Sequence, residues 1–163
     1  MKTDNFPFPF YLSKARDQEQ ARLRAWATDP EHFKMIARVQ QAPRLVLGNT
    51  ATHSKPNTVS IQASEMHYCE PRKTIEFHYY SSFEVGFPCT AHRADEILEP
   101  WADEDAEGPS GIYINVPVAA VQEYVDYLGG ITGYLSNYKE NTIEPLHLTE
   151  QDITYYSLYC SNG

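Results

Sequence analysis

The feature that most constrains the fold of this chain is a long run of alternating side chains between Ile75 and Phe87. Odd positions of the run carry mainly apolar residues, and even positions carry mainly polar ones. A period of two places successive side chains on opposite faces of a β-strand, so the run predicts a strand with one buried face. Residues 57–69 begin with the same alternation, and residues 70–73 have the composition of a turn. The two runs therefore predict an antiparallel hairpin.

The register of this hairpin follows from matching the two apolar faces. The match places Ile61 opposite Phe83 and Val59 opposite Val85, with residues 70–74 as the connecting loop. In this register Glu65 and His67 would fall on the apolar side. A β-bulge near Ser64 would remove that conflict, because one extra residue reverses the side-chain alternation.

A third strand is predicted at 111–116, followed by a helix that Pro117 opens and Gly129–Gly130 end. The apolar stripe of this helix consists of Val118, Val121, Val125 and Leu128. The tail remains open between two structures. Thr149 and Asp152 have the spacing of a helix capping box, whereas residues 153–159 are aromatic enough for a strand.

The N-terminal region begins with an aromatic–proline arm, Phe6 to Tyr11, for which we expect an extended path in a groove of its own domain or of a neighbour. Ser13 can cap a helix from Lys14 to Ala27, and a second helix is expected between Asp29 and Pro43. Residues 48–57 have the composition of a linker or loop.

Together these elements predict an α+β fold: an antiparallel β-sheet with a packed C-terminal helix and an appended N-terminal helical layer. We divide the chain into an arm and basic helical layer, residues 1–56, and an acidic α+β body, residues 57–163. A chain of 163 residues is long enough for one ordinary hydrophobic core.

The net charge of −9 is unevenly distributed along the chain. Residues 1–56 carry nine Lys/Arg and five Asp/Glu, whereas residues 57–163 carry four and seventeen. An acidic body repels the nucleic-acid backbone, so we do not expect direct nucleic-acid binding. The body could instead meet a basic protein surface, or its acids could simply keep it soluble. No apolar run approaches the length of a membrane span and no secretory signal is visible, so we expect a cytoplasmic protein without a membrane partner.

Catalytic and metal-binding motifs are absent from the sequence, so neither a metal nor a cofactor is expected. There is no phosphate-binding loop, dinucleotide fingerprint, zinc-protease motif or nucleophile elbow. The three cysteines form no Cys-x-x-Cys pair and are expected to be reduced thiols. One catalytic alternative stays open: a small hydrolase or transferase that uses His67, Cys69 or His78.

The polar face of the predicted hairpin, with Arg72 at its rim, is a candidate surface for a ligand or partner. It offers hydroxyl, amide, imidazole and carboxylate groups on a rigid sheet, and Arg72 could meet a phosphate or carboxylate. The alternative is a solvated sheet face. The binding candidates from this face are Gln62, Ser64, Arg72, His78, Tyr80 and Glu84.

Several segments resemble a family of small accessory proteins encoded by bacteriophages. They are Val59–Ser64, His67–Cys69, Pro71–Arg72, Phe83–Pro88, Pro100–Asp103 and Tyr113–Gly130. The resemblance implies a binding role for Gln62, His67, Tyr68 and Arg72. It also implies a non-enzymatic inhibitor that counters a bacterial defence system, either by occluding a host defence protein or by sequestering a small nucleotide signal.

We also expect a homo-oligomer, most simply a dimer. The arm from Phe6 to Tyr11 carries much aromatic surface, and the tyrosines of the tail, Tyr155, Tyr156 and Tyr159, offer a second contact surface. The basic N-terminal region of one copy could lie on the acidic body of another. The alternative is a monomer in which the arm and the helices fold back onto their own body.

Overall fold

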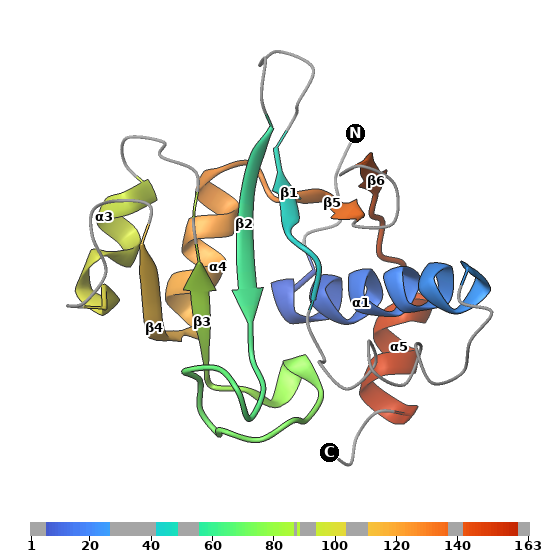
Figure 1. Cartoon of the computed structure of the whole chain (residues 1–163), viewed down its shortest axis with the longest axis horizontal. Helices are drawn as coiled ribbons and strands as arrows, with labels where there is room; N and C mark the ends of the chain where they lie inside the picture. Colours follow the sequence, from blue (N-terminus) through green and yellow to red (C-terminus); the bar gives the residue numbers. More distant parts are fainter. Residues whose placement is uncertain are drawn as a thin grey trace.

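The α+β architecture is confirmed by the structure, a computed structural model that describes residues 6–26, 42–48, 56–86, 88, 94–103, 111–136 and 142–159. One six-stranded antiparallel sheet has the order β4-β3-β2-β1-β5-β6 (Figure 1). Its strands are β1 (Leu45–Leu47), β2 (Asn57–Gln62), β3 (Ser82–Gly86), β4 (Ile112–Pro117), β5 (Ile131–Ser136) and β6 (Thr142–Pro145).

Helices precede the first strand and follow the last strand in the sequence, and others lie between strands. In the described residues they are α1 (Phe8–Trp26), α3 (Ala94–Leu98), α4 (Val118–Tyr127) and α5 (Glu150–Tyr159), with the single-turn 3-10 helices η2 (Phe77–Tyr79) and η3 (Glu99–Trp101). None of these helices combines the length and the apolar character needed to cross a membrane. The second N-terminal helix, expected between Asp29 and Pro43, lies outside the described residues except for its expected end.

The two long strands of the predicted hairpin are shorter than expected, and their register differs. β2 ends at Gln62, β3 begins only at Ser82, and Ile61 pairs with Val85 instead of Phe83. The alternating pattern before Ser82 does not correspond to a strand. Residues 77–79 form one turn of 3-10 helix, in which side chains three positions apart lie on the same side, so Phe77 and Tyr80 are both buried. The predicted and observed registers differ by two residues, so the apolar face of the hairpin is preserved.

The β-bulge also lies elsewhere than predicted. The pairing of β3 with β4 shifts between Phe83 and Val85, and opposite this point Asn115 has a φ of 50°. Asparagine adopts this left-handed conformation more readily than most side chains. The conflict at Glu65 and His67 is avoided differently, because the chain leaves the sheet after Gln62 and turns.

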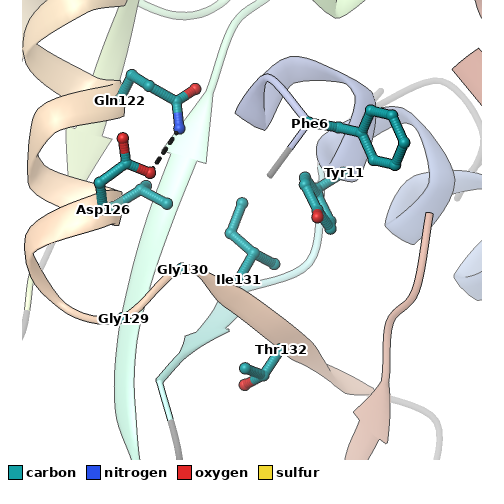
Figure 2. Close-up of a pocket in the computed structure, with 9 residues that line it drawn as sticks. Phe6, Tyr11, Gln122, Asp126, Gly129, Gly130, Ile131 and Thr132 are labelled. Carbon is teal, nitrogen blue, oxygen red and sulfur yellow. Dashed lines mark hydrogen bonds between the residues drawn. The ribbon is translucent and has the colours of Figure 1, made fainter. Parts of the chain in front are cut away.

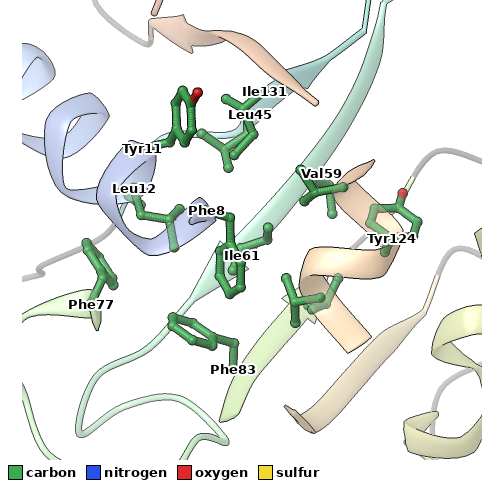
Figure 3. Packing of buried hydrophobic residues seen from close by; sticks show 14 of the residues in the cluster. Phe8, Tyr11, Leu12, Leu45, Val59, Ile61, Phe77, Phe83, Tyr124 and Ile131 are labelled. Carbon is green, nitrogen blue, oxygen red and sulfur yellow. The ribbon is translucent and has the colours of Figure 1, made fainter. Parts of the chain in front are cut away.

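The aromatic arm was predicted to be extended, but from Phe8 onward it forms the first turn of α1. The helix therefore begins before the expected Lys14, and Ser13 lies inside it instead of capping it. Pro9 is compatible with this position because the first N–H groups of a helix have no partner within the helix. Phe8 and Leu12 are fully buried in the core (Figure 3), and the Phe8 and Phe83 rings pack edge to face with their centroids 5.0 Å apart. Within the arm, Phe8 and Tyr11 are thus buried in their own chain, whereas Phe6 and Phe10 are only partly buried.

The core lies where α1 and α4 cover the sheet. The N–H of Phe8 donates to Oε1 of Gln122 on α4 at 2.8 Å, so the two helices meet directly. The buried side chains of α4 are Ala120, Val121, Tyr124 and Val125. β1 comes from the first 56 residues and lies centrally, between β2 and β5.

The tail forms a helix, which resolves the alternative left open by the sequence. The N–H of Asp152 donates to Oγ1 of Thr149 at 3.2 Å, and the N–H of Thr149 donates to Oδ2 of Asp152 at 2.9 Å. This reciprocal capping box fixes the start of α5. Polar contacts then join α5 to α1, because Lys14 binds Asp152 at 2.7 Å and the Tyr156 hydroxyl donates to Asp17 at 2.8 Å.

Replacing Gly48 by alanine is expected to lower the free energy of unfolding by about 2 kcal/mol. Gly48 has a φ of +72°, and an added Cβ would lie 2.5 Å from the carbonyl oxygen of Leu128. Gly86 is the matched control, because a Cβ there would lie at an ordinary 3.7 Å from Cβ of Ser60. Urea unfolding followed by circular dichroism measures both variants, and equal losses would contradict the proposed strain at Gly48.

Candidate functional site

The connection between β2 and β3, residues 63–81, contains most of the candidate site residues. It follows the end of β2 at one end of the sheet (Figure 1). Ser64, His67, Tyr68 and Arg72 all lie on this loop, and the carboxylate of Glu84 reaches it from β3. The structure thus brings five of the eight candidate residues together.

Ser64 and His67 form a close pair inside the first turn of the loop. The Ser64 hydroxyl oxygen lies 2.6 Å from Nδ1 of His67, and it also accepts the N–H of Met66 at 3.0 Å. Ser64 is buried and His67 half-buried. Burial lowers the pKa of His67 below its usual value, against the opposing charge of Glu84 and with the help of Arg72. The neutral imidazole therefore serves as a hydrogen-bonding partner that fixes the turn.

The backbone of Tyr68 is held from both sides. Its N–H donates to Oε2 of Glu84 at 2.9 Å, and its carbonyl accepts the N–H of Asn115 at 3.1 Å. Glu84 lies opposite the bulge in β4, and the left-handed conformation of Asn115 belongs to the same irregularity. Bulges commonly redirect groups beside functional sites. Here the bulge region fixes the position of Tyr68.

The exposed side chains of the loop include Met66, Tyr68 and Arg72, and we call these three residues the loop surface. Met66 is 75% exposed and Tyr68 is 48% exposed, while Arg72 is also exposed. The guanidinium carbon of Arg72 lies 4.9 Å from the centre of the Tyr68 ring, within the range of a cation–π contact. Tyrosine, arginine and methionine are enriched at protein interfaces.

Three candidate residues lie apart from the five that the structure brings together. The amide of Gln62 clamps the backbone of Ala42, accepting its N–H at 3.0 Å and donating to its carbonyl at 2.6 Å. Tyr80 is buried, and its hydroxyl donates to the carbonyl of Lys73. His78 lies on η2 and stacks on Phe10 of α1 at 5.2 Å. Gln62 and Tyr80 act structurally, and His78 contacts the N-terminal helix.

Cys69 is a poor nucleophile in this arrangement. Its thiol donates to the carbonyls of Ser64 and Pro71, and burial raises its pKa above the usual value, which disfavours the thiolate. His67 pairs with Ser64 instead of with Cys69. The Cys–His pair of the hydrolase or transferase alternative is therefore not assembled in this structure.

Two residues of the site were not among the sequence candidates. Met66 was missed because apolar residues in a predicted strand are assigned to the core, and only the turn at 64–69 exposes it. Asn115 was missed because it contributes to the site through its backbone N–H and not through its side chain. An asparagine inside an apolar strand is the sequence signal that could have located the bulge. Among the described residues, no group of three or more His, Cys, Asp or Glu is placed to hold a metal ion.

Comparisons with protein-family models, with curated proteins and with solved structures found no significant match to this chain.

Proposed function

We propose that this protein acts by binding another protein through the loop surface, and that it has no catalytic activity. The observation that supports this most is that the loop exposes large side chains on a backbone that hydrogen bonds hold in place. Met66 and Tyr68 present large side chains to solvent. Their N–H groups donate to Ser64 and Glu84, and the Tyr68 carbonyl accepts the N–H of Asn115, so the backbone beneath them is held in place. A loop ordered before binding loses less conformational entropy on association.

The partner we propose is a bacterial defence protein with a basic surface, inhibited in the cytoplasm of the host cell. The support for a defence target is the sequence resemblance to bacteriophage accessory proteins. The support for a basic partner is the net charge of −9, which favours association with positive surfaces. Arg72 then supplies one positive group inside an acidic molecule, where it can select a matching carboxylate.

A double substitution of the loop surface tests this proposal. Tyr68→Ala combined with Arg72→Ala is expected to abolish inhibition, because aromatic and arginine side chains dominate interface energies and Tyr68 alone is expected to account for about 30-fold in affinity. The readout is phage plaquing efficiency on a panel of strains, each carrying one defence system and expressing the protein. Tyr127→Ala is the matched control, because Tyr127 is 50% exposed but lies on α4.

The outcomes separate binding from catalysis. A loss with the double variant and none with Tyr127→Ala supports the proposal, whereas equal results for the two variants contradict it. If His67→Gln abolishes the effect and the loop-surface variant retains it, the hydrolase or transferase alternative is correct. Complete inhibition by a substoichiometric amount of protein also supports the enzyme.

A further inference from the structure

The loop between β2 and β3 carries two sulfur-containing side chains that differ sharply in exposure. Met66 is 75% exposed, whereas Cys69, further along the same turn, is only 3% exposed. Cysteine and methionine are both open to oxidation, and exposure decides which sulfur atom an oxidant reaches. The loop therefore presents one sulfur atom to solvent and encloses the other.

The thiol of Cys69 is protected from oxidation. Its Sγ donates to the carbonyl oxygen of Ser64 at 3.2 Å and to that of Pro71 at 3.5 Å, and burial raises its pKa above the usual value. Oxidants attack the thiolate, so a buried thiol that keeps its proton reacts slowly.

The thioether of Met66 lacks this protection. It has no proton to lose, so its reactivity depends chiefly on the access of the oxidant to the sulfur atom. The N–H of Met66 donates to Oγ of Ser64 at 3.0 Å, and the same oxygen lies 2.6 Å from Nδ1 of His67. These contacts stabilise the turn that exposes Met66, so its side chain stays accessible in the folded protein.

The loop surface is also more open than the recess where α4 ends and β5 begins. That recess (Figure 2) has a volume of about 20 Å³, enough for about one water molecule, and its Tyr11 and Ile131 belong to the core. A partner side chain does not fit there. By contrast, Met66 has the most exposed large hydrophobic side chain among the described residues.

Oxidation of Met66 would change the polarity of the loop surface without breaking the chain. Hydrogen peroxide transfers one oxygen atom to the thioether sulfur, its O–O bond breaks, and the remaining oxygen leaves as water. An electron pair of the sulfur forms the new S–O bond, so the sulfur is oxidised and the peroxide is reduced. The resulting sulfoxide is polar, so its burial against an apolar partner surface is unfavourable.

We propose that Met66 makes the loop surface redox-sensitive: peroxide converts its thioether to the sulfoxide and thereby weakens binding of the partner protein, while Cys69 in the same turn stays reduced. This inference rests on the proposed protein-binding function. Methionine sulfoxide reductases return the thioether, so the change is reversible.

The oxidation step is tested by treating the folded, full-length protein with hydrogen peroxide and locating the added oxygen by mass spectrometry of its peptides. Met66 is expected to react within about threefold of the rate of Nα-acetyl-methionine amide, because solvent reaches its side chain. Cys69 is expected to remain a thiol until urea unfolds the chain. Oxidation of Cys69 before Met66, or rapid oxidation of Met66 only after unfolding, would overturn the inference.

The effect on binding is tested with two variants of Met66 in the plaquing assay. Met66→Gln places a polar side chain of similar length at this position, whereas Met66→Leu, the matched control, stays apolar and does not react with peroxide. Met66→Gln is expected to reduce inhibition at least about tenfold, and Met66→Leu is expected to retain it. Equal results for the two variants, whether inhibition is kept or lost, contradict the inference. The double variant Tyr68→Ala, Arg72→Ala is measured beside them, and full inhibition by it would show that the proposed function itself is wrong.

Discussion

Replacing Glu76 by glutamine is expected to lower the free energy of unfolding by about 3–5 kcal/mol. Glu76 neutralises Arg16, whose side chain is only 6% exposed, through contacts of 3.0 and 3.2 Å from Nη2. It also accepts the hydroxyl of Ser13 at 3.2 Å. The substitution would leave Arg16 buried beside Asp17 alone, and a buried charge that loses a partner is costly. Chemical denaturation at neutral pH measures the loss.

The matched control is Glu144→Gln. Glu144 binds Arg22 at 2.7 Å, a shorter contact than that between Arg16 and Glu76, but the Arg22 side chain is 40% exposed. Ion pairs that water reaches contribute little to stability, so only a small fraction of the Glu76 effect is expected. If both variants lose the same free energy of unfolding, the contact between Arg16 and Glu76 does not act as a buried ion pair.

Replacing Phe8 by alanine is also expected to lower the free energy of unfolding by about 3–5 kcal/mol. The side chain is fully buried, and its ring packs edge to face on Phe83. Its removal would leave a cavity where α1 meets the sheet. Leu158→Ala is the control, because Leu158 is 64% exposed and its truncation should change stability by no more than about 0.5 kcal/mol.

The Phe8 variant also tests how the N-terminal arm is used. If the arm belongs to the core of its own chain, Phe8→Ala unfolds at lower denaturant concentration and its mass by light scattering matches that of the wild type. If the variant keeps its stability but loses mass, the arm is instead a contact between copies of the chain.

The sequence predicted the parts of the fold that local patterns determine. The helix after Pro117, its end at Gly129–Gly130 and the preceding strand are confirmed. Each has a signal within a few residues, such as a proline at the start or glycines of positive φ at the end.

Of the three strands that the sequence analysis missed, β1, β5 and β6, the first and the last lack such signals. β1 consists of three residues that are all buried, Leu45 to Leu47, so it shows no alternation between apolar and polar positions. β6 is short and mostly exposed at the sheet edge. The hairpin register was missed because two registers differing by two residues bury the same face, and only the chain beyond Gln62 decides between them.

The candidate site was predicted in part for a similar reason. Ser64, His67, Tyr68 and Arg72 are close in sequence, so any compact loop brings them together. The structural use of Gln62 and Tyr80 depends on the backbone of Ala42 and Lys73, whose positions follow from the tertiary fold. The sequence alone does not show whether a polar side chain forms its hydrogen bonds within the fold or remains available to a ligand.

A native mass spectrum of the protein isolated from defence-active cells tests the proposed protein-binding function most directly. The account predicts a complex with a second polypeptide in the wild type, and loss of that complex when Tyr68 and Arg72 are both replaced by alanine. A wild-type mass increased only by a small nucleotide would contradict it, because the bound partner would then be a signalling molecule and not a defence protein.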